Sequence, residues 1–180
     1  MFETETELEE LQKLLDASFD RAGKQLSGFD ETNRLSAHEL SGFKGIRLVA
    51  VATVNSKGEP RVAPRSAAFL HGKFYLAANS KSILVQRLSR TPLLGITYFE
   101  NRLLIMGHGT AAPFREGTST FEALRPEWVK AFKGGKDALE GIDTLIRVDA
   151  DHMVAFAAKP DQYPEAWKER PFPAPKRKKR

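Results

Sequence analysis

Residues 46–114 read IRLVAVATVNSKGEPRVAPRSAAFLHGKFYLAANSKSILVQRLSRTPLLGITYFENRLLIMGHGTAAPF and form the most strongly patterned part of the chain. The pattern contains five apolar runs rich in β-branched and aromatic residues, bounded by Gly, Asn, Asp or Pro, at 46–54, 61–69, 74–78, 93–99 and 102–111. Such runs are typical of consecutive antiparallel strands. A short helical pattern, SILVQRL, lies between the third and fourth runs. Strands this short and this closely spaced predict a small barrel, so the expected fold class is mainly β with flanking helices (α+β).

The second run carries two prolines, Pro60 and Pro64, which offer no backbone N–H to a neighbouring strand. We therefore expect this strand to lie at an edge of the sheet or to carry a bulge. An opening at this edge would admit a ligand.

Helical and hairpin patterns flank the stretch. Leu8, Leu11, Leu15 and Phe19 recur at helical spacing and predict an amphipathic helix over residues 4–26. A capping box of Ser36 and Glu39 predicts a short helix at 37–43. A further helix should carry Trp128, with Pro126 in its first turn. Two last apolar runs, 144–148 and 152–158, predict a closing hairpin around residues 149–151.

Length and charge indicate one folded domain over residues 1–170 and a basic tail at 171–180. The tail ends in KRKKR, whose five positive charges equal the formal net charge of +5, so the rest of the chain is balanced. This distribution makes nucleic acid an unlikely partner, although a nucleic-acid-binding module using the tail remains an alternative. The chain has no cysteine, no membrane-spanning run and an acidic N-terminus, from which we expect a cytoplasmic location and no contact with a membrane.

The best candidate ligand site in the sequence is the segment Asn79, Ser80, Lys81 and Ser82, where a strand gives way to a helix. Backbone donors at a helix start, two hydroxyls and a lysine together suit a phosphate monoester. The alternative interpretation is that Ser80 or Ser82 caps the helix and Lys81 is solvated.

The order and spacing of these elements resemble the pyridoxamine 5'-phosphate oxidase-like, FMN-binding split β-barrel family. The resemblance is carried by ATVNSKGEPRVAP at 52–64, HGKFYLAANSKS at 71–82, RLSRTPLLGITY at 87–98 and the end of the strand at Gly107. It implies a homodimer of split barrels with FMN in a cleft between the subunits. The implied activity is oxidoreduction of a small-molecule substrate with an electron donor, and a non-catalytic flavin carrier is an alternative.

The resemblance also implies which residues contact the cofactor: Arg61, Arg65, Ser66, Ala78, Asn79, Ser80, Lys81, Ser82 and, from the neighbouring subunit, Arg102. The chain departs from the family at Ile83 and Leu84, where many relatives carry Arg and Lys. Lys81 would substitute for one missing cation, and the deazaflavin F420 is an alternative cofactor.

No catalytic side chain and no metal site is expected. The four histidines show no paired metal-ligand spacing, so we interpret each as a surface or turn residue. Gly107, Gly109 and Ala112 match a dinucleotide-binding pattern, but Pro113 and the lack of a following helical run oppose that interpretation.

Overall fold

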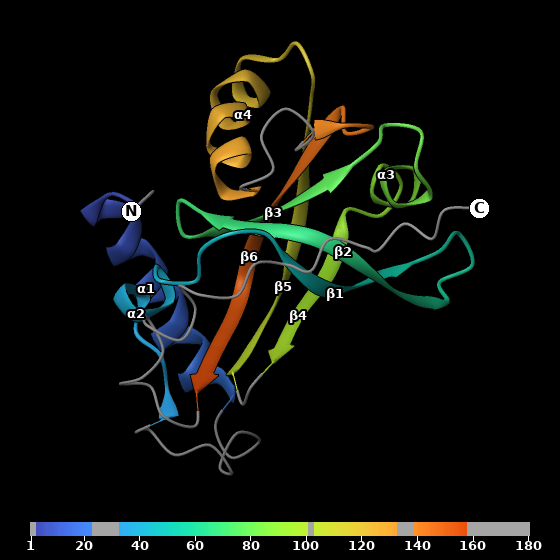
Figure 1. Cartoon of the computed structure of the whole chain (residues 1–180). Coiled ribbons are helices and arrows are strands. Elements are labelled where there is room, and N and C mark those ends of the chain that lie inside the picture. Colours follow the sequence, from blue (N-terminus) through green and yellow to red (C-terminus); the bar gives the residue numbers. More distant parts are fainter. Residues whose placement is uncertain (1–2, 23–32, 101–102, 133–138, 158–180) are drawn as a thin grey trace, which may run out of the picture.

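The computed structural model describes residues 3–22, 33–100, 103–132 and 139–157. Its elements follow the chain as α1 (Glu5–Ala22), α2 (Ala37–Leu40), β1 (Arg47–Val54), β2 (Pro60–Leu70), β3 (Lys73–Ala78), α3 (Ile83–Leu88), β4 (Leu93–Glu100), β5 (Leu103–Arg115), α4 (Ser119–Phe132) and β6 (Thr144–Ala157). The six strands are all antiparallel and close into a barrel in the order β1-β2-β3-β6-β5-β4. Figure 1 shows the helices placed around this barrel. The predicted fold class, a barrel with flanking helices, is confirmed.

Alternation of side chains explains why these strands form a barrel. In β1, Val49, Val51 and Thr53 are buried while Leu48, Ala50 and Ala52 are exposed. The interior is filled by aromatic rings that meet edge to face, among them Phe43, Phe69 and Phe74, with centroids 5.0–6.5 Å apart. This geometry suits the ring quadrupoles and fixes the core around which the strands close.

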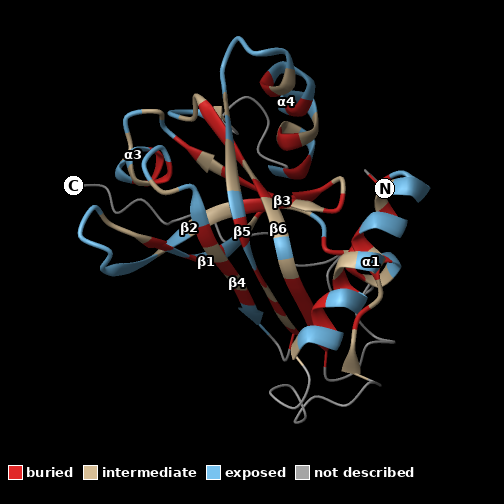
Figure 2. Cartoon of the chain, turned by 180° about the vertical axis from the view of Figure 1, so that it is seen from behind, coloured by how far each residue is buried: buried red, intermediate tan, exposed pale blue. Residues whose placement is uncertain are grey.

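Two helices cover one side of the barrel. Helix α1 packs on β6, where the ring of Phe19 meets that of Phe156 at 5.1 Å and the buried Ser18 Oγ accepts a hydrogen bond of 2.9 Å from the Met153 backbone. Helix α4 packs on the other end of the same side through the fully buried Trp128. Figure 2 shows these buried contact surfaces in red.

His71 joins the two helices to the turn between β2 and β3. Its Nδ1 lies 3.1 Å from Glu7 of α1, and its Nε2 lies 2.7 Å from Glu127 of α4. Burial alone would lower the pKa of His71, but these two carboxylates raise it above its ordinary value. The protonated imidazole therefore acts as an ionic link between α1, α4 and the barrel.

The opening predicted at the second strand is confirmed. The proline-containing part of β2, residues 60–66, pairs only with β1, and pairing with β3 starts at Ala67. One edge of this part of β2 is therefore not hydrogen-bonded to a neighbouring strand.

The predicted closing hairpin is wrong. Residues 144–157 form one continuous strand, β6, which pairs along β5 with a shift in register between His108 and Gly109. His108 lies opposite His152 and Gly109 lies opposite Ala150, so Asp151 is the extra residue of a bulge. The Asp-Ala-Asp sequence has the composition of a turn, but β5 is long enough to pair with both halves.

The structure confirms parts of the three remaining helix predictions. The capping box of Ser36 and Glu39 is confirmed, and it starts a shorter helix than predicted. Pro126 lies inside α4 and not in its first turn, because the helix begins earlier, where the Thr118 hydroxyl accepts from the Phe121 N–H. Helix α1 is confirmed as far as Ala22, while residues 23–26 of the prediction and the tail at 171–180 lie outside the described residues.

Candidate functional site

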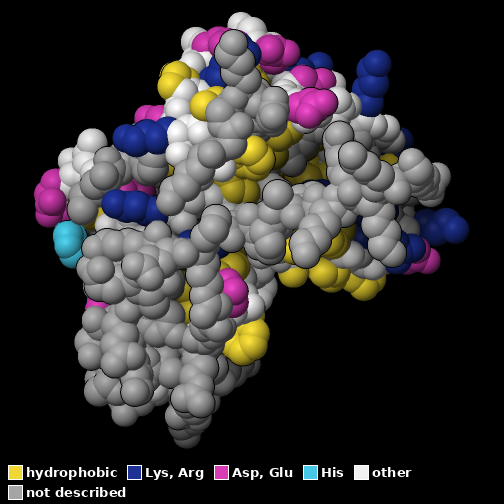
Figure 3. Space-filling model, in the orientation of Figure 1, with side chains coloured by type: hydrophobic (Ala, Val, Ile, Leu, Met, Phe, Trp, Pro, Cys, Tyr) yellow, Lys and Arg dark blue, Asp and Glu magenta, His cyan; other side chains and the backbone are white. Residues whose placement is uncertain are grey.

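One side of the barrel carries an apolar surface that no described helix covers. It consists of the outward-facing side chains of β1, β2 and β4, and Val62 and Phe99 are 70% and 74% exposed. Leu48 and Leu93 are also about half exposed, at 49% and 58%. Figure 3 shows hydrophobic side chains along the β1–β2 hairpin, with charged side chains toward its tip. Exposed apolar patches of this kind mark sites of ligand or protein contact.

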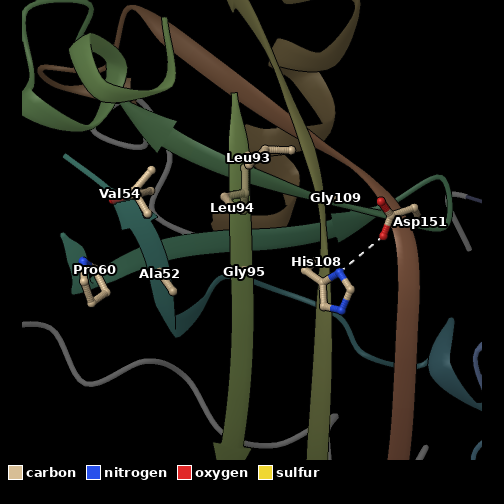
Figure 4. Close-up of a pocket in the computed structure, with 10 residues that line it drawn as sticks. Ala52, Val54, Pro60, Leu93, Leu94, Gly95, His108, Gly109 and Asp151 are labelled. Atoms are coloured by element: carbon tan, nitrogen blue, oxygen red, sulfur yellow. Dashed lines mark ion pairs between the residues drawn. The ribbon is translucent and has the colours of Figure 1, made fainter. Parts of the chain in front are cut away.

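A hollow of about 480 Å³ lies within this surface. It is lined by Ala52, Thr53, Val54, Pro60, Leu93, Leu94, Gly95, His108, Gly109 and Asp151. Figure 4 shows how β1, β4 and β5 form its floor and how the bulge of β6 forms one wall. Ala52 and Gly95 are register partners, and their small side chains keep the floor flat. The volume lies within the range of small-molecule sites, and the lining is mostly apolar.

The polar groups of the hollow stand together at the bulge. The Nδ1 atom of His108 lies 3.2 Å from the Asp151 carboxylate, as the dashed line in Figure 4 marks. The ring of His108 also stacks on that of His152, with centroids 4.8 Å apart and planes 14° apart. The contacts of the His108 ring are thus one ion pair and one ring stack, and its side chain is 61% exposed.

The bulge that creates this arrangement depends on Gly109. A Cβ atom at this position would lie 2.1 Å from the Asp149 carbonyl oxygen and 2.7 Å from the Ala150 Cα. Only glycine permits so close an approach of two strands. Arg21 of α1 supports the bulge from the other side, because its Nη2 donates to the Asp151 carbonyl oxygen at 2.5 Å.

His152 is the more buried member of the stacked pair. Burial lowers its pKa below the ordinary value, and the neighbouring charges of His108 and Arg21 lower it further. His152 is therefore less readily protonated than a free imidazole.

The segment 79–82, which was predicted to bind a phosphate, does not line the hollow. Ser80 donates from its backbone N–H and from its hydroxyl to the Asp143 carboxylate, at 2.5 Å and 2.6 Å. The hydroxyl contact is the main cause that lowers the pKa of Asp143. An anion of the protein itself therefore occupies the donors of Ser80.

The other members of this segment have local partners. Ser82 caps α3, since its Oγ accepts from the Val85 N–H at 3.3 Å. Asn79 accepts from the Lys81 N–H and donates to the Gly141 carbonyl oxygen. The Lys81 side chain is exposed, and Ala78 is buried at the end of β3.

The two arginines predicted on β2 lie on the same side of the sheet as α3. Arg61 is opposite Thr53 and Arg65 is opposite Val49, on the face of β1 that is buried beneath α3. Arg61 is exposed and Arg65 is partly exposed, on a part of β2 that has a free edge. Arg61 contacts Glu59 at 2.6 Å, and Arg65 donates to its neighbouring carbonyl.

No predicted site residue within the described part of the chain lines the hollow, which is on the face of β1 opposite Arg61 and Arg65. Ser66 faces outward beside Leu48, and Arg102 lies outside the described residues. Of the two departures from the family, Ile83 is exposed and Leu84 is buried in the core. His108 and Asp151 were missed, because only the register of β5 and β6 brings them together.

Comparison with known proteins supports the fold. No family model and no curated protein matches the sequence. Among solved structures, the conserved hypothetical protein Rv2991 of Mycobacterium tuberculosis has a TM-score of 0.55 and 16% identity, covering 73% of this chain and 91% of that protein.

Two other similar structures are named for heme. HutZ, the heme storage protein of Vibrio cholerae, has a TM-score of 0.57 and 14% identity, covering 70% of this chain and 99% of its own. A heme-binding protein of Mycobacterium smegmatis has a TM-score of 0.51 and 16% identity, covering 73% of this chain and 61% of its own. These likenesses show that the chain shares its fold, a six-stranded antiparallel barrel with flanking helices, with these structures.

Proposed function

We propose that this chain is a homodimeric split-barrel protein that binds a flat redox cofactor. The observation that carries the proposal is the uncovered apolar surface of β1, β2 and β4, with a hollow of about 480 Å³ in it. A flat conjugated ring suits a flat floor of small residues better than a compact polar ligand does. No helix of the described residues is long and apolar enough to span a membrane.

The apolar surface favours a second copy of the chain as its cover. Val62 and Phe99 project into solvent in the single chain, and a twofold axis would place the same apolar surface of a second copy against them. Light scattering of the purified protein should report about twice the chain mass of 20.1 kDa. Val62→Glu should give a monomer with an unchanged circular dichroism spectrum, whereas Lys13→Glu on the exposed face of α1 should remain a dimer. A dimer that persists in Val62→Glu would place the interface elsewhere.

FMN is the first candidate cofactor. The free edge of β2 presents Arg61 and Arg65 on the α3 side of the sheet, and exposed Lys81 stands at the loop before α3. These cations are of the type that holds a phosphate. Because they lie on the face of β1 opposite the hollow, FMN would bind along the free edge of β2 on the α3 side of the sheet and not on the floor of the hollow. The flavin ring would supply hydride or electron transfer, and the chain would supply binding and orientation. F420 is an alternative in the same position, and a flavin carrier without catalysis is a further alternative.

Heme is the second candidate, favoured by a specific observation. The hollow is lined by a histidine, His108, whose Nδ1 lies 3.2 Å from the Asp151 carboxylate. Two proteins of similar fold are named as heme storage and heme-binding proteins. Histidine is a common protein ligand of heme iron, and an apolar lining suits a porphyrin ring.

The cofactor class is tested by absorption of the protein as isolated, followed by titration with FMN, F420 and ferric heme. Saturable binding of one of these at one site per chain or per dimer supports the proposal, and failure of all three to bind overturns it. If FMN binds, reduction of the complex by a nicotinamide donor distinguishes an oxidoreductase from a carrier.

A further inference from the structure

We propose that residues 158–170, which follow β6, fold back over the hollow of their own chain and place the Trp167 side chain in it. The segment reads AKPDQYPEAWKER and lies outside the described residues. Its Trp167 is one of the two tryptophans of the chain, and the other, Trp128, is fully buried in the core. The inference goes beyond the proposed function, because it assigns to the hollow an occupant from within the chain.

The segment begins at an end of the barrel that is close to the hollow. Strand β6 ends at Ala157, which is the register partner of Leu103, and Leu103 is in turn the partner of Glu100 at the end of β4. The hollow lies on the same strands, at the level where Gly95 is opposite His108. Five residues of strand and two strand spacings separate these points, which amounts to about 20 Å.

The surface between this end of the barrel and the hollow is largely apolar. Two register pairs of β4 and β5 face outward along it, Phe99 with Leu104 and Thr97 with Met106. Phe99 is 74% exposed, and the other three side chains are only partly buried. A segment that runs back along β4 and β5 would remove this apolar surface from water, which favours its docking there.

The reach of the chain favours Trp167 as the side chain that enters the hollow. Trp167 is ten residues beyond Ala157, and an extended chain of this length spans up to about 33 Å. This is enough to reverse direction at the end of β6 and to reach the hollow. Tyr163 is six residues beyond Ala157, and its maximum reach of about 20 Å leaves no length for the reversal.

The indole of Trp167 also matches the chemistry of the lining. It is a large apolar group that carries a single N–H donor. The small residues Ala52 and Gly95 leave room for a ring on the floor of the hollow, and the wall carries the Asp151 carboxylate, which is 70% exposed and can accept from the indole N–H. Phe172 is also within reach of the hollow, but it has no donor for Asp151.

A segment in this position affects the two candidate cofactors differently. FMN along the free edge of β2 would lie on the other face of β1 and would be unaffected. Heme in the hollow would have to displace Trp167. The second copy of the proposed dimer would pack directly on Val62, which does not line the hollow, and on Phe99 through the segment.

The test is the fluorescence of Trp167 in the full-length chain, measured as the difference between each protein and its own Trp167→Phe form. This difference removes the emission of the buried Trp128. In the parent, Trp167 should emit at shorter wavelength than N-acetyltryptophanamide and should be quenched several-fold less by acrylamide. Ala52→Glu places a carboxylate on the floor and should make Trp167 as accessible as the free compound. The matched control is Ala123→Glu on the exposed face of α4, which should leave Trp167 protected.

The source of the segment is tested by co-expression of the Ala52→Glu chain with the Trp167→Phe chain. In a mixed dimer, the only Trp167 belongs to the chain whose own hollow is blocked, so it should remain accessible. Protection regained in the mixed dimer would place the segment in the hollow of the second copy and overturn the inference, while the dimer would stand. Accessible Trp167 in the parent, or protection that persists in Ala52→Glu, would also overturn it. Melting curves of each variant establish that exposure of Trp167 does not result from unfolding.

Discussion

The bulge between β5 and β6 leads us to predict that Gly109→Ala strongly lowers the stability of the protein. In Gly109→Ala, the new Cβ would lie 2.1 Å from the Asp149 carbonyl oxygen, 2.9 Å from its carbonyl carbon and 2.7 Å from the Ala150 Cα. All three are backbone atoms, so no side-chain rotation can relieve the overlap, and the strands must separate by about 1 Å, which also weakens their neighbouring contacts. Overpacking of this kind costs about 3 kcal/mol. With a urea m-value of about 2 kcal/mol/M, the unfolding midpoint should fall by about 1.5 M.

Gly95→Ala is the matched control, because Gly95 lies on the neighbouring strand directly opposite His108. Its Cβ would be 3.6 Å from the Ala52 Cβ, an ordinary contact, and alanine loses less conformational freedom on folding than glycine does. At equal protein concentration, this variant should keep or slightly raise the urea midpoint. An unchanged midpoint in Gly109→Ala would falsify the described bulge and, with it, the orientation of Asp151 toward His108.

Two further predictions concern the ionic link at His71 and the cation at Lys81. Because the pKa of His71 is raised in the folded state, its contribution to stability is complete below its ordinary pKa of 6.5 and is lost as the pH rises through the folded value. The melting temperature should therefore fall as the pH rises above 6.5. This fall should be smaller in His71→Asn, which removes the titrating ring and keeps a residue that tolerates the positive φ of 52° at this turn. If FMN is the cofactor, Lys81→Ala should weaken its binding by about 10-fold to 100-fold and leave riboflavin binding unchanged. Lys57→Ala, on the hairpin turn, is the control and should change neither, while equal FMN affinity in Lys81→Ala and the parent would remove Lys81 from the site.

The barrel could be predicted from the sequence because its determinants are local. Alternation in β1 separates the buried Val49 and Val51 from the exposed Ala50 and Ala52, and the turns are marked by their own residues. The same local reasoning failed at 149–151, because an Asp-Ala-Asp sequence has the same composition in a turn and in a bulge. Whether residues 149–151 form a turn or a bulge depends on the partner strand β5, which places Gly109 opposite the bulge.

The hollow could not be predicted from the sequence either, because its polar residues are brought together only by the pairing of two strands. His108 and Asp151 are far apart in sequence, and neither belongs to a motif, so their contact follows only from the register of β5 and β6. The G-H-G sequence of β5 was noted for its glycines, whose role is to allow the close approach of β6 and not to bind a dinucleotide. A glycine-flanked histidine on a long strand was the available signal.

The contact of Ser80 with Asp143 bears on how a phosphate could bind near α3. A phosphate at the Ser80 donors must displace a carboxylate that accepts two hydrogen bonds, and each such bond to a charged group contributes about 1.5–3 kcal/mol. Asp143 lies near the surface, so water would compensate much of this loss once the carboxylate is released. Repulsion between the phosphate and the released carboxylate would remain. The cations Lys81, Arg61 and Arg65, and not the hydroxyl of Ser80, would therefore provide the affinity for FMN.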